Sequence, residues 1–182
     1  MAVLIISGSL RKDSVNRKLV AQAGEIYGGE VITADLNLPL YDGDLEAAEG
    51  QPAAVKTLAD QLATAEAVII STPEYNKAPS GVLKNALDWM SRDSRKLFAG
   101  KPVAVMSAAA GRTGGETAQY VLRNMLSPLR ANVIAGPALC IASAGKEFET
   151  GQLENDRYLA NLAELMDLLR STAAVTKAAK AA

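Results

Sequence analysis

The sequence predicts an α/β protein, a three-layer α/β/α sandwich in which a five-stranded parallel sheet lies between two layers of helices. Short, continuous apolar runs at 2–7 and 67–72 are typical of strands that are buried on both faces of a parallel sheet. Such runs alternate along the chain with longer segments whose apolar residues recur at helical spacing. Strand–helix alternation favours a doubly wound parallel sheet, because each crossover packs its helix onto the sheet.

Five strand–helix units follow one another without a repeat or an internal linker, so residues 1–182 are expected to form one domain. Strands are expected at 2–7, 30–35, 67–72, 101–108 and 132–141. Helices are expected at 14–27, 54–65, 79–92, 114–130 and 153–171.

Local signals support these bounds. Gly28 and Gly29 end the first helix, and Pro52 stands where a first-turn proline opens the second. Segment 37–51 contains one proline and two glycines and is expected to be a long connection. The final stretch, 172–182, is rich in alanine and lysine and is expected to fray.

Composition excludes several classes of chemistry. The chain has no histidine, which excludes imidazole acid–base catalysis and histidine metal ligands, and no metal site is predicted. Its single cysteine, Cys140, excludes an intramolecular disulfide and fits a reducing compartment. The net charge of −1 disfavours nucleic-acid binding, and no apolar run approaches the roughly 20 residues of a membrane helix. We expect a cytoplasmic protein whose chemistry comes from a cofactor.

The loop at 8–16 leads from the first strand into the first helix, where free N–H groups favour an anion. Hydroxyls of Ser9 and Ser14, the amide of Asn16 and the guanidinium of Arg11 suit a terminal phosphate such as that of FMN. The loop is neither a G-x-G-x-x-G turn nor a P-loop. The alternative is an ordinary helix cap by Ser14 beside a solvated basic turn.

Two further loops end neighbouring strands, where ligands bind in open α/β sheets. Loop 72–81 carries Glu74, Tyr75 and Asn76 on a backbone stiffened by proline, a suitable wall for a flat heterocycle. Loop 107–115 consists mostly of small residues, with Arg112 near the coming helix start. The alternatives are a proline-containing turn packed on the sheet edge and a flexible glycine loop.

Taken together, three segments resemble the NADPH-dependent FMN reductase family, in particular its quinone and chromate reductase branch. The matching text is GSLRKDSVNRKL, then TPEYN followed by GVLKNALDWMSR, then KPVAVMSAAAGRTGGETAQYVLR. The similarity runs in order from residue 2 to about residue 130, and PEYN with LKN and DW at this spacing is its specific part.

The resemblance implies a flavodoxin-like sheet in the order 2-1-3-4-5, FMN bound without a covalent link, and a homodimer or homotetramer. It implies that NAD(P)H reduces the flavin, which then reduces small-molecule acceptors such as quinones, free flavin, chromate or ferric complexes, so no side chain is predicted to be catalytic. Three groups of residues would hold the cofactor. The residues expected to hold the phosphate are Ser9, Arg11, Ser14, Val15 and Asn16. Those expected to line the isoalloxazine and ribityl chain are Pro73, Glu74, Tyr75 and Asn76. Those expected to approach the pyrimidine edge of the ring are Ala109, Gly111 and Gly114.

Three features depart from the family pattern. Asp13 stands where the family often has glycine and places an acid beside the expected phosphate. Pro79 is shifted relative to the family proline, which leaves the local backbone path open. Ala108 and Ala109 replace family hydroxyls.

Four basic residues, Lys77, Arg92, Arg95 and Arg112, are candidates for the NAD(P)H phosphates because they border the flavin loops. The alternative is that these side chains are solvated and bind no ligand, and that those near the end of a helix complement its dipole. Alternative functions are a flavodoxin-like electron carrier or a flavin-binding regulatory protein without NAD(P)H turnover. The near-neutral charge and few aromatic residues disfavour the carrier.

Overall fold

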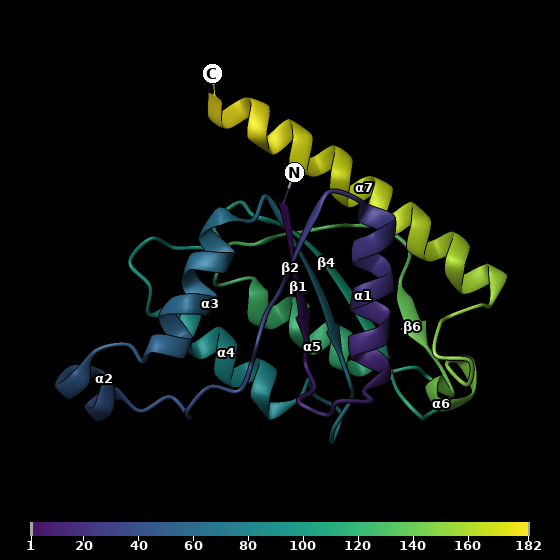
Figure 1. The fold of residues 1–182 in the computed structure, drawn as a ribbon, viewed down its shortest axis with the longest axis horizontal. Coiled ribbons are helices and arrows are strands. Elements are labelled where there is room, and N and C mark those ends of the chain that lie inside the picture. Colours follow the sequence, from purple (N-terminus) through teal and green to yellow (C-terminus); the bar gives the residue numbers. More distant parts are fainter. Residues whose placement is uncertain (1, 182) are drawn as a thin grey trace.

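The computed structural model describes residues 2–181 as a parallel sheet between two layers of helices (Figure 1). Its strands are β1 Ala2–Ser7, β2 Glu30–Thr33, β3 Ala67–Thr72, β4 Pro102–Ala108, β5 Asn132–Val133 and β6 Leu139–Ile141. Its helices are α1 Val15–Tyr27, α2 Gly43–Glu49, α3 Ala53–Thr64, α4 Gly81–Ser91, α5 Glu116–Leu126, α6 Ala144–Glu147 and α7 Asp156–Ala181. The strand order is β2-β1-β3-β4-β5, with β6 also paired to β4 and every pairing parallel. The predicted order and the flavodoxin-like fold are confirmed.

Successive residues of each central strand enter two different hydrophobic cores. In β1, Val3 and Ile5 pack with residues of α1 and α7, whereas Leu4 and Ile6 pack with residues of α3, α4 and α5. The same alternation runs through β3 and β4. Because helices cover both faces, both sets of side chains must be apolar, which explains the continuous apolar runs in the sequence.

The fifth strand is split in two, which corrects the prediction of one strand at 132–141. The two parts, β5 and β6, both pair with β4, but the register shifts by three residues between them. Gly136 and Pro137 lie in the interruption, and proline has no N–H to donate to a strand ladder.

Several helices also differ from expectation, and the short α6 was not expected at all. The connection 37–51 contains the short helix α2, whose first turn is capped by the Asp42 carboxylate. Helix α5 is shorter than predicted at both ends. Helix α7 continues to Ala181 rather than ending near 171, since alanine and lysine are strong helix formers and Lys177 pairs with Glu66 at 2.5 Å. Within residues 2–181, no helix is both long and apolar enough to cross a bilayer.

Candidate functional site

A cavity of about 370 Å³ lies beyond the carboxyl ends of β1, β3 and β4, and we call it the carboxyl-edge cavity. Its lining is Ser9, Arg11, Asp13, Ser14, Val15, Asn16, Pro73, Glu74, Tyr75, Ala108, Ala109, Ala110, Ala144 and Gly145. The three loops that sequence reasoning singled out therefore meet at one place. Nine of the twelve residues expected to hold the cofactor line this cavity; the exceptions are Asn76, Gly111 and Gly114.

The start of α1 forms one end of the cavity. Ser14 is the N-cap, and its Oγ accepts a hydrogen bond from the Asn16 N–H at 3.2 Å. The Arg11 N–H donates to Ser9 Oγ at 3.3 Å, while the exposed Arg11 guanidinium has no ion-pair partner among residues 2–181. The first turn of α1 carries no acid, so the positive end of the helix dipole is not neutralised there. This end of the cavity suits an anion.

Asp13 also lines the cavity, one residue before the Ser14 cap. Its side chain is exposed and pairs with no cation in the described part of the chain. A carboxylate in this position opposes the attraction that Arg11 exerts on an anion.

Asn16 is buried, and its side-chain amide bonds to the ends of two strands. Its Nδ2 donates to the Ala108 carbonyl at 2.9 Å, and its Oδ1 accepts from the Ser71 hydroxyl at 2.6 Å and the Ala108 N–H at 3.1 Å. These bonds join the start of α1 to the ends of β3 and β4. The amide therefore positions the loops, and Asn16 also lines the cavity, so the phosphate contact expected from the sequence stays a prediction.

The loop after β3 contains a tight two-residue turn. Tyr75 and Ala78 exchange both backbone hydrogen bonds, at 2.9 and 3.0 Å. Between them Asn76 and Lys77 have φ of 50° and 64°, the left-handed conformation that a hairpin turn of this kind requires. Asn76 lies in this turn and is not part of the cavity lining. The turn also gives the backbone path that the shifted proline left open, because the chain reverses between Tyr75 and Ala78, before Pro79.

Glu74 has a role that the sequence did not suggest. Its Oε2 accepts from the Ala118 N–H at 3.1 Å, and its Oε1 pairs with the exposed Lys77 ammonium at 3.4 Å. The N-cap of α5 is Gly115, which has no side chain to accept such a bond. Glu74 thus caps α5 from a neighbouring loop, where a carboxylate also complements the helix dipole.

The loop after β4 is shaped by close packing behind the cavity. Gly114 has φ of 62° and lies so close to β6 that a Cβ would be 2.5 Å from the Cys140 carbonyl. Its own carbonyl accepts from the Ser107 hydroxyl at 2.7 Å. Gly114 therefore packs against the next strand instead of facing the cavity. Burial raises the pKa of the Cys140 thiol.

The four basic candidates occupy different surroundings, and none of them lines the cavity. Arg92 pairs with Glu46 at 2.9 Å and lies over the Tyr41 ring. The exposed Arg112 forms no ion pair within residues 2–181.

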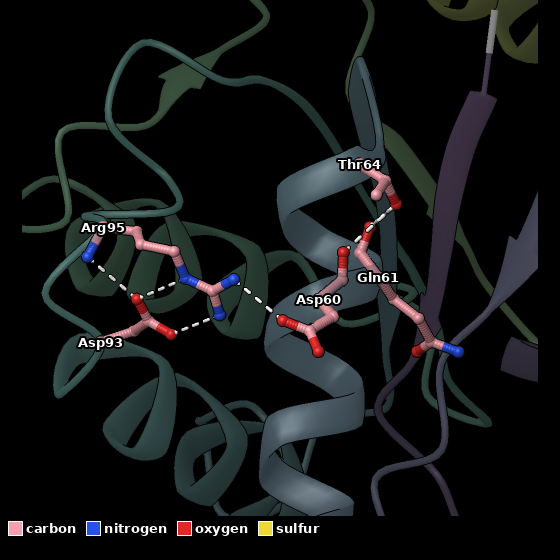
Figure 2. A network of polar contacts seen from close by, with 5 residues as sticks. All are labelled: Asp60, Gln61, Thr64, Asp93 and Arg95. Carbon is pink, nitrogen blue, oxygen red and sulfur yellow. Dashed lines mark hydrogen bonds and ion pairs between the residues drawn. The ribbon is translucent and has the colours of Figure 1, made fainter.

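The Arg95 guanidinium is held between Asp93 and Asp60, at 2.7 and 2.8 Å (Figure 2). Hydrogen bonds from Arg95 lower the pKa of Asp93, and the two carboxylates raise the pKa of Arg95. The bonds drawn in Figure 2 connect the loop after α4 to α3, so Arg95 acts there as a brace.

The residues present fit FMN. The Arg11 guanidinium, the Ser9 and Ser14 hydroxyls and the Val15 N–H offer donors for a phosphate, since the Val15 N–H has no acceptor within residues 2–181. The small side chains of Ala108–Ala110 leave room for a flat ring beside Tyr75.

Sequence reasoning missed Ala144 and Gly145, which line the cavity from the start of α6. The predicted fifth strand ends at residue 141, at the same carboxyl edge as its neighbours, and ligands bind at that edge in open α/β sheets, which is the signal that points to the loop after it.

Comparisons with known proteins identify the family of this chain. The model of the NADPH-dependent FMN reductase family matches residues 1–146. The chain is 42% identical over 159 residues to an NAD(P)H-dependent FMN reductase of Pseudomonas aeruginosa, covering 85% of each chain. It is 38% identical over 159 residues to a quinone reductase of Escherichia coli, covering 85% of this chain and 80% of that one.

Among solved structures, it is similar to the flavoenzyme NAD(P)H:(acceptor) oxidoreductase of Paracoccus denitrificans, with a TM-score of 0.82 and 30% identity. That match covers 96% of this chain and 98% of the other. The family match spans all three loops that form the cavity, and the chain belongs to the NADPH-dependent FMN reductase family.

Proposed function

We propose that this protein is an FMN-dependent oxidoreductase that takes hydride from NAD(P)H and passes the electrons to small acceptors such as quinones. The observation that supports it most strongly is the carboxyl-edge cavity, where Arg11 and the start of α1 offer unpaired donors beside a wall of small residues. Family membership and the relatives' activities support the same reaction.

In this proposal, the loop at 8–16 binds the FMN phosphate through Arg11, Ser9, Ser14 and the Val15 N–H. Bound FMN supplies the hydride-accepting and electron-donating chemistry. The protein contributes position and electrostatics, so a chain without histidine is sufficient for the reaction.

The donor nucleotide approaches from the open side of the cavity. Arg112 is the best placed of the four basic candidates for its phosphates, because it is exposed and has no ion-pair partner in residues 2–181. Lys77 is exposed beside Tyr75 and comes second, since its pairing with Glu74 is loose at 3.4 Å. Arg92 and Arg95 are engaged in ion pairs and are assigned a structural role.

Quinones are the acceptors we propose first, because several relatives are quinone reductases. We also propose a homodimer or homotetramer in the cytoplasm, where a protein with one cysteine needs no oxidising compartment.

A matched pair of variants tests the site. Arg11→Gln removes a cation that lines the cavity, whereas Lys12→Gln removes the adjacent exposed cation that does not. We expect Arg11→Gln to weaken FMN binding about tenfold or more and to leave riboflavin, which lacks the phosphate, unaffected. Lys12→Gln should change both affinities little, as measured by fluorescence titration of the apoprotein.

Steady-state oxidation of NADPH and NADH with a benzoquinone as acceptor then tests turnover. Tight FMN binding without turnover by either nucleotide would identify an electron carrier or a regulatory protein instead. Equal effects of the two variants on FMN affinity would contradict the assigned phosphate site.

A further inference from the structure

A second cavity of about 330 Å³ lies at the opposite edge of the sheet, and we call it the amino-edge cavity. It is lined by Met90 and Ser91 at the end of α4, by residues 96–98 before β4 and by residues 128–130 before β5. Parallel strands all begin at one edge, so this cavity lies where β4 and β5 start, whereas the flavin site lies where strands end. Its volume is in the range of small-molecule sites.

One wall of the amino-edge cavity is apolar. Met90, Leu97 and Phe98 are buried and belong to the core that α3, α4 and α5 share. Leu129, which is partly buried, packs against the same core. An apolar part of a ligand would therefore contact a rigid hydrophobic surface.

The charge of the lining has one sign. Lys96 and Arg130 are its only charged residues, and neither forms an ion pair within residues 2–181. The neighbouring acid, Asp93, is already held by the Arg95 brace of Figure 2. Two cations with no carboxylate among the lining residues create a positive potential that attracts an anion.

The backbone supports the same conclusion. Lys96 and Arg130 both have left-handed backbones, with φ of 51° and 58°, although lysine and arginine rarely adopt this conformation. Backbone hydrogen bonds hold both: the Lys96 N–H donates to the Asp93 carbonyl, and the Arg130 N–H donates to the Ser127 carbonyl. Strained backbone held in this way is often associated with a ligand site.

Two amide groups in the same wall lack partners. The N–H groups of Leu97 and Phe98 donate to no acceptor in the described part of the chain, although both residues are less than 10% exposed. Backbone N–H groups without a protein acceptor can donate to a ligand. Successive N–H groups next to a left-handed residue commonly form an anion-binding concavity.

We propose that the amino-edge cavity binds a small amphipathic anion, an aromatic carboxylate, as a site separate from that of FMN. The aromatic ring lies against Met90, Leu97 and Phe98. The carboxylate is held between the Lys96 ammonium and the Arg130 guanidinium, which matches a carboxylate with two parallel N–H groups. The apolar wall favours such a ligand over a fully hydrated inorganic anion.

The test uses the protein saturated with FMN and 2-naphthoate as the probe, with neutral 2-naphthamide as the matched ligand. Calorimetry measures affinity, and two-dimensional amide NMR of the wild type locates the site. We expect naphthoate to shift the Leu97 and Phe98 amide resonances, and to bind at least tenfold more tightly than naphthamide. The double variant Lys96→Gln/Arg130→Gln should bind naphthoate at least tenfold more weakly than the wild type. The control variant Lys56→Gln, which replaces an exposed lysine on α3 outside the cavity, should bind it as the wild type does.

Naphthoate binding that shifts resonances of the carboxyl-edge loops and leaves Leu97 and Phe98 unmoved would overturn the proposal. Equal affinity for naphthoate and naphthamide would do so as well, because the cations would then play no part. If naphthoate does not bind at all, the proposal is likewise overturned, whether the cavity has no affinity for it or a second copy of the chain covers the cavity. None of these outcomes depends on NAD(P)H turnover, so they are distinguishable from a failure of the proposed function.

Discussion

Asn16 connects three parts of the carboxyl-edge cavity through one buried amide. Its side chain contacts the end of β3 through Ser71 and the end of β4 through both backbone groups of Ala108. The sequence predicted that Asn16 lies at the carboxyl edge of the sheet, because it follows a buried strand, and Asn16 lines this cavity. It could not reveal the bonds that the amide makes to the sheet, since both partners are more than 50 residues away in the sequence.

Replacing Asn16 by alanine should destabilise the protein and loosen the site. The change leaves the Ser71 hydroxyl and both Ala108 backbone groups without their partner, at a cost of about 3 kcal/mol. Urea denaturation should show this loss, together with weaker FMN binding. Asn37→Ala, at an exposed position whose side chain makes no hydrogen bond within residues 2–181, is the control. An Asn16→Ala protein as stable as this control would contradict the assigned role.

Asp13 offers a test of the charge balance at the same end of the cavity. The variant Asp13→Asn removes a negative charge from the lining and keeps the side chain's size. We expect FMN to bind about threefold to tenfold more tightly, which is roughly 1 kcal/mol of relieved repulsion. Riboflavin affinity should stay unchanged, and the gain should shrink as salt is raised. A gain that is equal for riboflavin would mean that Asp13 acts on the fold and not on the phosphate.

At the scale of elements, the loop after β4 depends on its contact with β6. The matched pair Gly114→Ala and Gly111→Ala tests this dependence within one loop. A Cβ at Gly114 overlaps the Cys140 backbone at a left-handed position, whereas a Cβ at Gly111 meets nothing within 4 Å. We expect Gly114→Ala to lower the free energy of unfolding by more than about 2 kcal/mol, and Gly111→Ala to change it by less than about 0.5 kcal/mol. Thermal unfolding of both variants measures the difference, and similar melting temperatures would argue against the close contact between Gly114 and β6.

The C-terminal end of α3 depends on Lys101, whose ammonium is buried. Its Nζ donates to the Leu62 and Ala65 carbonyls at 2.7 and 2.5 Å. Burial, and secondarily the nearby Lys180, lower the pKa of Lys101 from 10.5 to about 8. The unfolded chain therefore binds more protons than the folded protein between about pH 8 and 10.5, so stability due to this group rises with pH across that window.

The variant Lys101→Met should remove that rise. Between pH 8 and 10.5, the free energy of unfolding of the wild type is expected to rise relative to that of the variant by at most about 3 kcal/mol, since each pKa unit corresponds to about 1.4 kcal/mol. Denaturation at a series of pH values measures the difference, with Lys56→Met as the control for loss of an exposed lysine. Parallel curves for wild type and Lys101→Met would show that the pKa of Lys101 is not lowered.

Helices and strands were predictable where one local pattern determined them. Buried strands such as β1 and β3 have the predicted bounds, because helices on both faces require apolar residues throughout. The fifth strand was predicted too long, because its apolar residues outweighed Gly136 and Pro137 in the pattern. The length of α7 depends on Ala173 and Lys177, whose contacts with the rest of the fold are not visible in a local pattern.

For the whole molecule, the sheet order follows from the alternation of strands and helices together with the family resemblance. The position of the cavity then follows from topology, because three loops that are distant in the sequence meet at one edge of the sheet. The basic residues were harder to place. Arg95 follows α4 in the sequence, but its guanidinium pairs with Asp60 of α3, and only tertiary packing creates this contact (Figure 2).

If the carboxyl-edge cavity holds FMN that NAD(P)H reduces, flavin absorbance reports that reaction without any added acceptor. The spectrum of the purified protein, reconstituted with FMN where needed, is recorded anaerobically before and after one equivalent of NADPH or NADH. We expect the bands of oxidised flavin and their rapid bleaching by at least one nucleotide. A protein that does not retain FMN, or whose bound flavin neither nucleotide bleaches, would contradict the proposed function.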